Sequence, residues 1–332
     1  MPCLDVVPTI ARVGELRIRA MTAADAAAVD DLLTAAEAVD RTDEHFNLED
    51  VLEEVENPMI DVSRDWLVAE VDGRVVAQSR LLPRAPAAGR VSVAVDGTVD
   101  PAHRRQGIGS RLVPLMVERA REYVRELGED LVPVITGHAP SDNADQAALF
   151  ARSGLHPDRW SFVMIADLAT WVGDEPEVPD GYRLTTWEGL DHEEMREAHN
   201  RAFAGHYGFT PWTAQMWDQW VASVRSLRSE HSLVLRGPEG DIAAYVQTSE
   251  FEAMEEAIGV KEAYVAKVGT LEAHRRRGLA ALLLSTALAR YRAAGFDRAA
   301  LDVDSENPTG ALGLYERVGF RTTMRWTSYR ST

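Results

Sequence analysis

Two short segments combine arginines with small residues in a pattern that can bind an anion. One reads Ala-His-Arg-Arg-Arg-Gly-Leu-Ala from Ala273 to Ala280, and the other reads Ala-His-Arg-Arg-Gln-Gly-Ile-Gly from Ala102 to Gly109. Each follows a strand-like apolar run and precedes a helical pattern, so the free N–H groups at the helix start would face outward. Arginines there oppose the helix dipole, and a bound phosphate explains them better than helix stability does. The sequence therefore predicts two phosphate-binding turns.

Both turns belong to a longer internal repeat. When Gly107 is aligned with Gly278, the arginine segments fall in register, and further along Leu149–Leu155 resembles Leu314–Phe320. The repeat predicts a duplicated α/β unit, in which strands and helices alternate around a mixed sheet. A stretch rich in proline, glycine and acids predicts the boundary between the copies. We expect an N-terminal domain at 1–168, a linker at 169–180 and a C-terminal domain at 181–332.

Local patterns add detail to this α/β architecture. Asp72-Gly73 between two apolar runs predicts a hairpin of 66–71 and 74–82 with a type I′ turn. Pro114 lies in the helix expected after the arginine segment Ala102–Gly109, and it should kink that helix or delay its start. The acidic run from Asp40 to Glu56 is expected to be irregular and solvated. The aromatic segment from His199 to Trp220 could form an acceptor pocket or simply pack the core.

Composition limits the possible partners of the chain. Its 332 residues are 45% hydrophobic and 27% charged, with a net charge of −18, which argues against a nucleic-acid binder. Cys3 is the single cysteine, and no apolar run is as long as a membrane span. We expect a cytoplasmic protein that binds neither nucleic acid nor membrane, as a monomer or homodimer.

The second turn and the motif after it resemble the GNAT family of N-acetyltransferases. The matching residues are Arg275–Ala280 after a strand, then Asn307 and the block Leu314-Tyr315 to Gly319-Phe320. The resemblance covers both halves and implies two tandem domains with a splayed mixed sheet. It also implies direct acetyl transfer from acetyl-CoA to a primary amine of a small molecule or peptide, without a metal. The layout is similar to tandem members, one of which acetylates a cysteinyl amine.

The resemblance also assigns roles to particular residues. Tyr315 would act as the general acid for the departing thiolate, although its ring could instead only pack the helix. Glu262, on the strand before the turn, would be the general base, with Glu250 in reserve, and a backbone N–H near Val268 would stabilise the oxyanion. The expected CoA contacts are Val268, Thr270, Arg275, Arg276, Arg277, Gly278, Leu279, Ala280 and Asn307, and in the first half Val99, Arg104, Arg105, Gln106, Gly107, Ile108 and Gly109.

The two halves differ at the positions that would transfer protons. Without gaps, Val91 falls opposite Glu262 and Phe150 opposite Tyr315. This difference predicts a catalytic second half and a first half that binds CoA or serves as a scaffold. A CoA-binding sensor without turnover is the alternative from another class.

Overall fold

The chain forms one continuous twelve-stranded sheet in the order β1-β2-β3-β4-β5-β12-β6-β11-β10-β9-β8-β7. This computed structural model describes residues 15–58, 60–86, 89–205, 209–305 and 310–331. The strands are β1 Leu16–Ala20, β2 Trp66–Val71, β3 Arg74–Pro83, β4 Arg90–Val99, β5 Val132–Pro140, β6 Leu155–Asp167, β7 Arg183–Thr186, β8 Leu233–Arg236, β9 Ile242–Ser249, β10 Glu262–Thr270, β11 Arg298–Asp304 and β12 Arg321–Ser331. The α-helices are α1 Ala26–Asp40, α2 Leu48–Glu56, α3 Val62–Asp65, α4 Ile108–Leu127, α5 Ala144–Arg152, α6 His192–Phe203, α7 Ala214–Trp217, α8 Glu252–Ile258, α9 Leu279–Ala293 and α10 Ala311–Val318.

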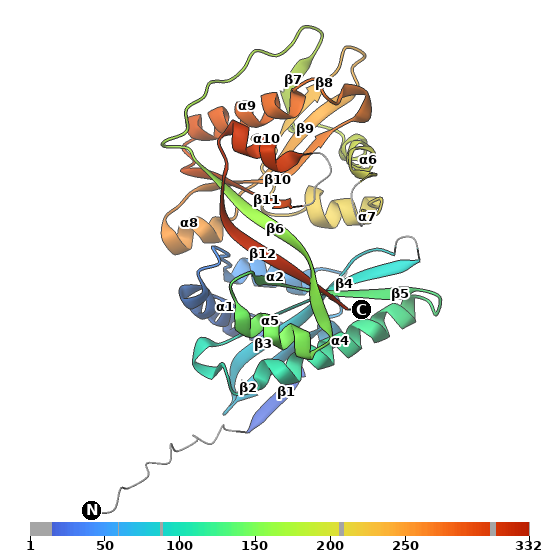
Figure 1. The fold of residues 1–332 in the computed structure, drawn as a ribbon, viewed down its shortest axis with the longest axis vertical. Coiled ribbons are helices and arrows are strands. Elements are labelled where there is room, and N and C mark those ends of the chain that lie inside the picture. Colours follow the sequence, from blue (N-terminus) through green and yellow to red (C-terminus); the bar gives the residue numbers. More distant parts are fainter. Residues whose placement is uncertain (1–14, 59, 87–88, 206–208, 306–309, 332) are drawn as a thin grey trace, which may run out of the picture.

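The two halves exchange their last strands. β12, from the second half, pairs with β5 of the first half, and β6 pairs with β11 of the second half. β6 and β12 also pair with each other, so they cross side by side between the halves (Figure 1). Each half therefore completes its sheet with a strand from the other.

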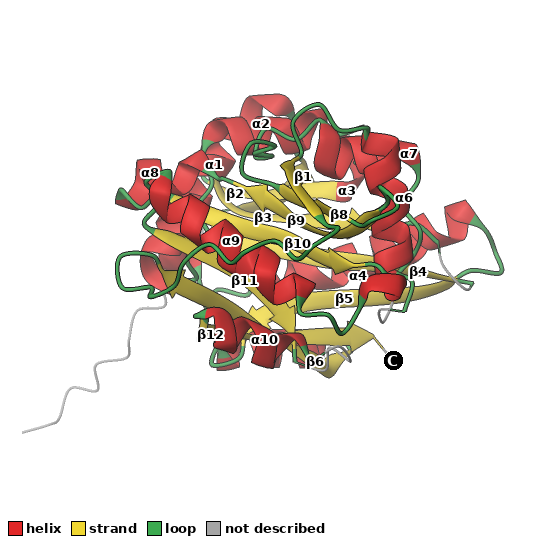
Figure 2. Cartoon of the chain, turned by 90° about the horizontal axis from the view of Figure 1, so that it is seen from above, coloured by secondary structure: helices red, strands yellow, loops and turns green. Residues whose placement is uncertain are grey.

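Helices cover both faces of the sheet (Figure 2). In the first half, Val68 packs with α1 and α2, whereas the next residue, Ala69, packs with α4. In the second half, Tyr245 packs with α6 and α7, whereas Val246 packs with α9. Neighbours on a strand point to opposite faces, and this alternation defines an α1/α6 face and an α4/α9 face.

Each half contains one pair of parallel strands that diverge. β4 and β5 pair from Arg90 and Val132 to Ala94 and Thr136. β10 and β11 pair only from Glu262 and Arg298 to Tyr264 and Ala300. The register between β9 and β10 shifts between Val265 and Lys267, which leaves Ala266 opposite no residue of β9. β4 pairs with β3 without such a shift.

The local predictions are confirmed at the hairpin and need correction elsewhere. Asp72 and Gly73 have φ angles of 51° and 80°, as a type I′ turn requires. The delayed helix start was wrong, because α4 begins at Ile108 and runs through Pro114. The acidic run is not irregular either. It contains α2, which Asn47 caps by accepting a hydrogen bond from the backbone N–H of Asp50.

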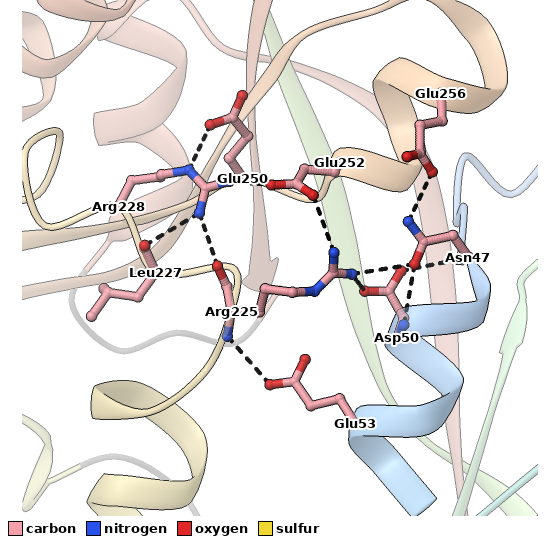
Figure 3. Close-up of polar contacts among 9 residues, drawn as sticks. All are labelled: Asn47, Asp50, Glu53, Arg225, Leu227, Arg228, Glu250, Glu252 and Glu256. Atoms are coloured by element: carbon pink, nitrogen blue, oxygen red, sulfur yellow. Dashed lines mark hydrogen bonds and ion pairs between the residues drawn. The ribbon is translucent and has the colours of Figure 1, made fainter. Parts of the chain in front are cut away.

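The acidic run is exposed at Glu49, Glu53 and Glu56, as the solvated-face prediction expects, but it also contacts the second half. Arg225 binds Asp50 and Asn47, and its backbone N–H donates to Glu53 Oε1 at 3.3 Å (Figure 3). Asn47 also donates to Glu256 Oε2 at 2.8 Å. The acids were charged partners for arginines distant in sequence, which a local pattern does not reveal.

Candidate active site

The two arginine turns share one backbone conformation. Arg105 and Arg276 have φ angles of 63° and 61°, and Gly107 and Gly278 have φ angles of 83° and 77°. Left-handed residues alternate with ordinary ones in each turn, which points successive N–H groups into one concavity, as in anion-binding nests. The buried side chains of Ile108 and Leu279 start α4 and α9 directly after the turns. Both predicted phosphate-binding turns therefore have the geometry for it.

In the second turn, the arginines bind neutral oxygen atoms. Arg275 donates to the carbonyl oxygens of Thr270 and Ala202, at 3.1 and 3.0 Å. Arg277 donates to the hydroxyl of Tyr182 at 3.1 Å. Within the described residues, none of the three guanidinium groups of this turn forms an ion pair with a carboxylate. Their positive charge is therefore available to a ligand.

In the first turn, carboxylates neutralise the arginines. Arg104 also donates through Nε to the carbonyl five residues earlier, that of Val99, at 3.0 Å. Its two terminal nitrogens bind Asp40 at the end of α1, at 2.6 and 2.7 Å. Arg105 binds Asp145 of α5. A phosphate would have to compete with these acids, which the sequence repeat did not show.

Tyr315 and Phe150 lie on corresponding helices, α10 and α5. Tyr315 is half-buried against the cluster that contains Val268 and Leu279, with its ring 6.0 Å from that of Phe320. Burial raises its pKa to about 12, so the hydroxyl stays protonated as a donor. Phe150 is buried and lines a cavity of about 50 Å³ where β4 and β5 diverge. Asn307 lies outside the described residues.

Glu262 is engaged by an arginine from the neighbouring strand. Its Oε2 accepts a hydrogen bond from Arg298 Nε at 2.6 Å, and Arg298 also binds Asp43 of the first half. Burial raises the pKa of Glu262, while Arg298 acts in the opposite direction. A raised pKa favours proton acceptance by a base, but the guanidinium occupies one oxygen.

Glu250, the reserve candidate, belongs to the network between the halves. Its Oε2 accepts a hydrogen bond from Arg228 Nε at 2.7 Å (Figure 3). Lys261 Nζ lies 3.7 Å from its other oxygen. The carboxylate of Glu250 is therefore engaged by two cations, Arg228 and Lys261.

The ungapped alignment of Glu262 with Val91 was wrong. The bulge adds one residue to β10, so that counting along the paired strands places Ser92 opposite Glu262 and Ala94 opposite Tyr264. Val91 belongs to the cluster beneath α4, on the other face of the sheet. The first half still lacks a carboxylate at this position.

Three polar residues that the sequence motifs did not mark, Tyr264, Lys267 and Asp302, lie on the α1/α6 face beside the strand divergence. Tyr264 donates to Asp302 Oδ2 at 2.7 Å. Lys267 lies over the ring of Trp212, with Nζ 5.0 Å from the centroid, and burial and the charge of Arg84 lower its pKa to about 8. The alternation of side chains along β10 could have placed Tyr264 and Glu262 on one face. It could not predict Lys267, which follows the bulge, or Asp302, which lies on the neighbouring strand β11.

A cleft of about 590 Å³ lies between the halves on this face. Its lining includes the loop 41–46 of the first half, Ile258 of α8, Val163 of β6 and Met324 of β12. Burial raises the pKa of Glu44 in that loop to about 7, and the negative charges of Asp96 and Asp302 contribute to the rise. The cleft is large enough for a small ligand.

The aromatic segment packs the core of the second half. His199 is 2% exposed and lies among Phe203, Trp212 and Trp217, with Nδ1 2.9 Å from the hydroxyl of Tyr245. Residues 206–208 are outside the described part. The packing alternative is favoured over the pocket, except at Trp212 beneath Lys267.

The duplicated fold, with its splayed strands and arginine turns, is that of tandem N-acetyltransferases. The model of the acetyltransferase (GNAT) family matches residues 27–154 and 192–320, and the chain belongs to this family. It is an N-acetyltransferase with two GNAT domains.

The chain is similar to known proteins over most of its length. It is 27% identical to a mycothiol acetyltransferase of Parafrankia sp. over 94% of this chain and 97% of the relative. It is 30% identical to the mycothiol acetyltransferase of Thermomonospora curvata over 78% of this chain and 79% of that relative. The fold is similar to a GCN5-related N-acetyltransferase from Sphaerobacter thermophilus, with a TM-score of 0.71, 25% identity and 95% coverage of both chains. The fold is also similar to a tandem GNAT protein from the clavulanic acid biosynthesis pathway, with a TM-score of 0.68 and 21% identity. That match covers 96% of this chain and 98% of the other protein.

Among the described helices, none is both long and apolar enough to cross a membrane.

Proposed function

We propose that the second half transfers an acetyl group from acetyl-CoA directly to a primary amine of a small molecule. The observation that carries this is the strand divergence after Tyr264, which opens beside a bulge and beside a turn whose arginines form no ion pair with a carboxylate of the described residues. Diphosphate oxygens would accept hydrogen bonds from the N–H groups of residues 276–280 and from the guanidinium groups. The first half would bind CoA weakly or serve as a scaffold.

The chemical step needs three contributions from the chain. The neutral amine attacks the thioester carbonyl, and main-chain N–H groups near the bulge and Val268 stabilise the oxyanion. Tyr315, whose raised pKa keeps it protonated, donates its proton to the departing CoA thiolate. A carboxylate on the α1/α6 face takes the proton of the acceptor ammonium. Glu262 is the candidate that the sequence supplies.

A narrower acceptor is the second candidate function. Several similar chains are named mycothiol acetyltransferase, and the match to the Parafrankia protein spans almost the full length of both. A mycothiol synthase-like reaction would acetylate the amine of a cysteinyl group. A cleft of about 590 Å³ accommodates an acceptor larger than a simple amine.

The test is release of free CoA thiol from acetyl-CoA with a panel of amines, amino sugars, peptides and a cysteinyl amino sugar. Acetyl transfer predicts amine-dependent thiol release and an acetylated product by mass spectrometry. Thiol release only with the cysteinyl acceptor would establish the narrower reaction. No release with any amine, despite acetyl-CoA binding, would favour the sensor alternative and contradict the proposal.

A further inference from the structure

Asp302 lies at the point where the paired strands separate. The last pair of β10 and β11 joins Tyr264 with Ala300, and Asp302 is two residues further along β11 on the same face. Its partner on the other side is Val163 of β6, which lines the cleft between the halves. The carboxylate thus lies at the strand divergence and is paired along the sheet with a residue that lines the cleft.

We propose that Asp302 binds the ammonium group of the acceptor and takes its proton, and that Tyr264 is the residue that positions it. The proposal rests on the acetyl transfer proposed above. The hydroxyl of Tyr264 donates to Asp302 Oδ2 at 2.7 Å, which fixes the carboxylate and leaves Oδ1 for the substrate.

Asp302 is better placed for this role than Glu262. The guanidinium of Arg298 already donates to Glu262 and would repel a substrate ammonium. Across the described residues, Asp302 forms no ion pair with a cation. Glu262 instead positions the first half, because Arg298 links it to Asp43 in the loop that lines the cleft.

The protons balance in this scheme. The acceptor ammonium gives one proton to Asp302, which passes it to cleft water, and the neutral nitrogen bonds to the acetyl carbon. As the carbon–sulfur bond breaks, Tyr315 protonates the CoA sulfur, and the second proton of the nitrogen restores Tyr315 through solvent. The products are the amide, CoA thiol and one proton.

The charged groups around Asp302 set the direction of its pH response. Tyr264 and Glu262 face it from β10, and Glu44 faces it from the loop of the first half. Burial raises its pKa and the Tyr264 hydrogen bond lowers it, with a net rise. Activity should therefore increase as pH rises through the pKa of Asp302, where the carboxylate becomes able to accept a proton.

The first half offers a matched control at the corresponding place. β4 and β5 last pair at Ala94 and Thr136, so His138 stands where Asp302 stands, and Ala94 stands where Tyr264 stands. Neither the tyrosine nor the carboxylate is present there.

The experiment compares pH profiles of kcat/KM for the best amine of the panel. Asp302→Asn should reduce kcat/KM about 100-fold and remove the acidic limb, as loss of a general base does. Tyr264→Phe should keep the limb but move it to higher pH, because it removes the hydrogen bond that lowers the pKa of Asp302. Glu262→Gln should keep the limb and move it slightly to lower pH, because it removes a negative charge that faces Asp302, and His138→Asn should keep the limb at its original pH.

Three outcomes decide the matter. Asp302→Asn within threefold of the wild type, or with the limb retained, would overturn the role of Asp302. Loss of the limb in Glu262→Gln alone would assign the proton to Glu262 instead. A wild type that acetylates no amine would overturn the proposed acetyl transfer itself, and with it this inference.

Discussion

The two arginine turns have nearly the same backbone but opposite electrostatic surroundings. In the first half, Asp40 and Asp145 hold Arg104 and Arg105. In the second half, Arg275 binds carbonyl oxygens and Arg277 binds a hydroxyl oxygen, and no carboxylate in the described part of the chain pairs with either of them. The repeated motif therefore indicates a repeated fold, whereas the partners of its side chains differ between the two copies.

The same contrast continues into the reaction space. Phe150 occupies the divergence of β4 and β5, where the remaining cavity is only about 50 Å³. In the second half, a bulge, Tyr315 and the Tyr264–Asp302 pair surround the corresponding opening. The comparison supports a division of labour between the halves.

Tyr315→Phe tests the chemical side of this comparison and should have a large effect. Loss of the proton donor should lower kcat by about 100-fold, whereas acetyl-CoA affinity should change less than about twofold. Steady-state kinetics and calorimetric titration of acetyl-CoA separate the two quantities.

The matched control is Tyr123→Phe on α4, a half-buried tyrosine of the first half. It should leave kcat unchanged. Full activity of Tyr315→Phe would retire its role as the acid and leave the packing interpretation.

Asp40→Asn tests the electrostatic side, with a smaller effect. Without its bidentate partner, Arg104 becomes available to phosphate, so CoA binding to the first half should strengthen by about tenfold, the value of one charge-assisted hydrogen bond. Calorimetry should show the stoichiometry moving toward two CoA per chain. Asp31→Asn on the same helix should change nothing, and unchanged stoichiometry in Asp40→Asn would show that the acids do not limit the first site.

Glu44→Gln should have the smallest effect and should concern stability. The pKa of Glu44 is about 7 in the folded protein against an ordinary value of 4.5, so the carboxylate destabilises the fold as pH rises through that window. The variant should unfold at a higher temperature than the wild type at pH 8. Its free energy of unfolding should be greater by on the order of 1 kcal/mol or less, because cleft water screens the charge. The difference should vanish at pH 4.5. A lower unfolding temperature at pH 8 would contradict the cleft electrostatics, and Glu49→Gln on α2 is the control.

Sequence patterns predicted those parts of the fold that depend on near neighbours. The Asp72-Gly73 turn and the repeated arginine turns each follow from a few consecutive residues. The exchange of β6 and β12 was not predictable, because either half could have closed its own sheet with the same strands. The partners of the acids from Asp40 to Glu56 were not predictable, because the arginines are distant in the sequence. Some of them, such as Arg225 and Arg298, lie in the other half.

The candidate site was predicted to a similar extent. Tyr315 and the turn from Arg275 to Ala280 come from contiguous motifs. Asp302 and Lys267 could not be found, since one depends on strand pairing and the other on a bulge that shifts the register by one residue. The same bulge explains why Val91 was placed opposite Glu262.

The most direct test of a catalytic second half is a pair of variants, Gly107→Glu and Gly278→Glu. Both glycines have positive φ and nothing within 4 Å of an added Cβ, so the two substitutions cost similar strain and place a negative charge in each turn. Thiol release at subsaturating acetyl-CoA should fall by about 100-fold or more in Gly278→Glu, because the carboxylate repels the diphosphate, and should stay within about twofold of the wild type in Gly107→Glu. Loss of turnover in a folded Gly107→Glu variant, with Gly278→Glu still active, would contradict the account.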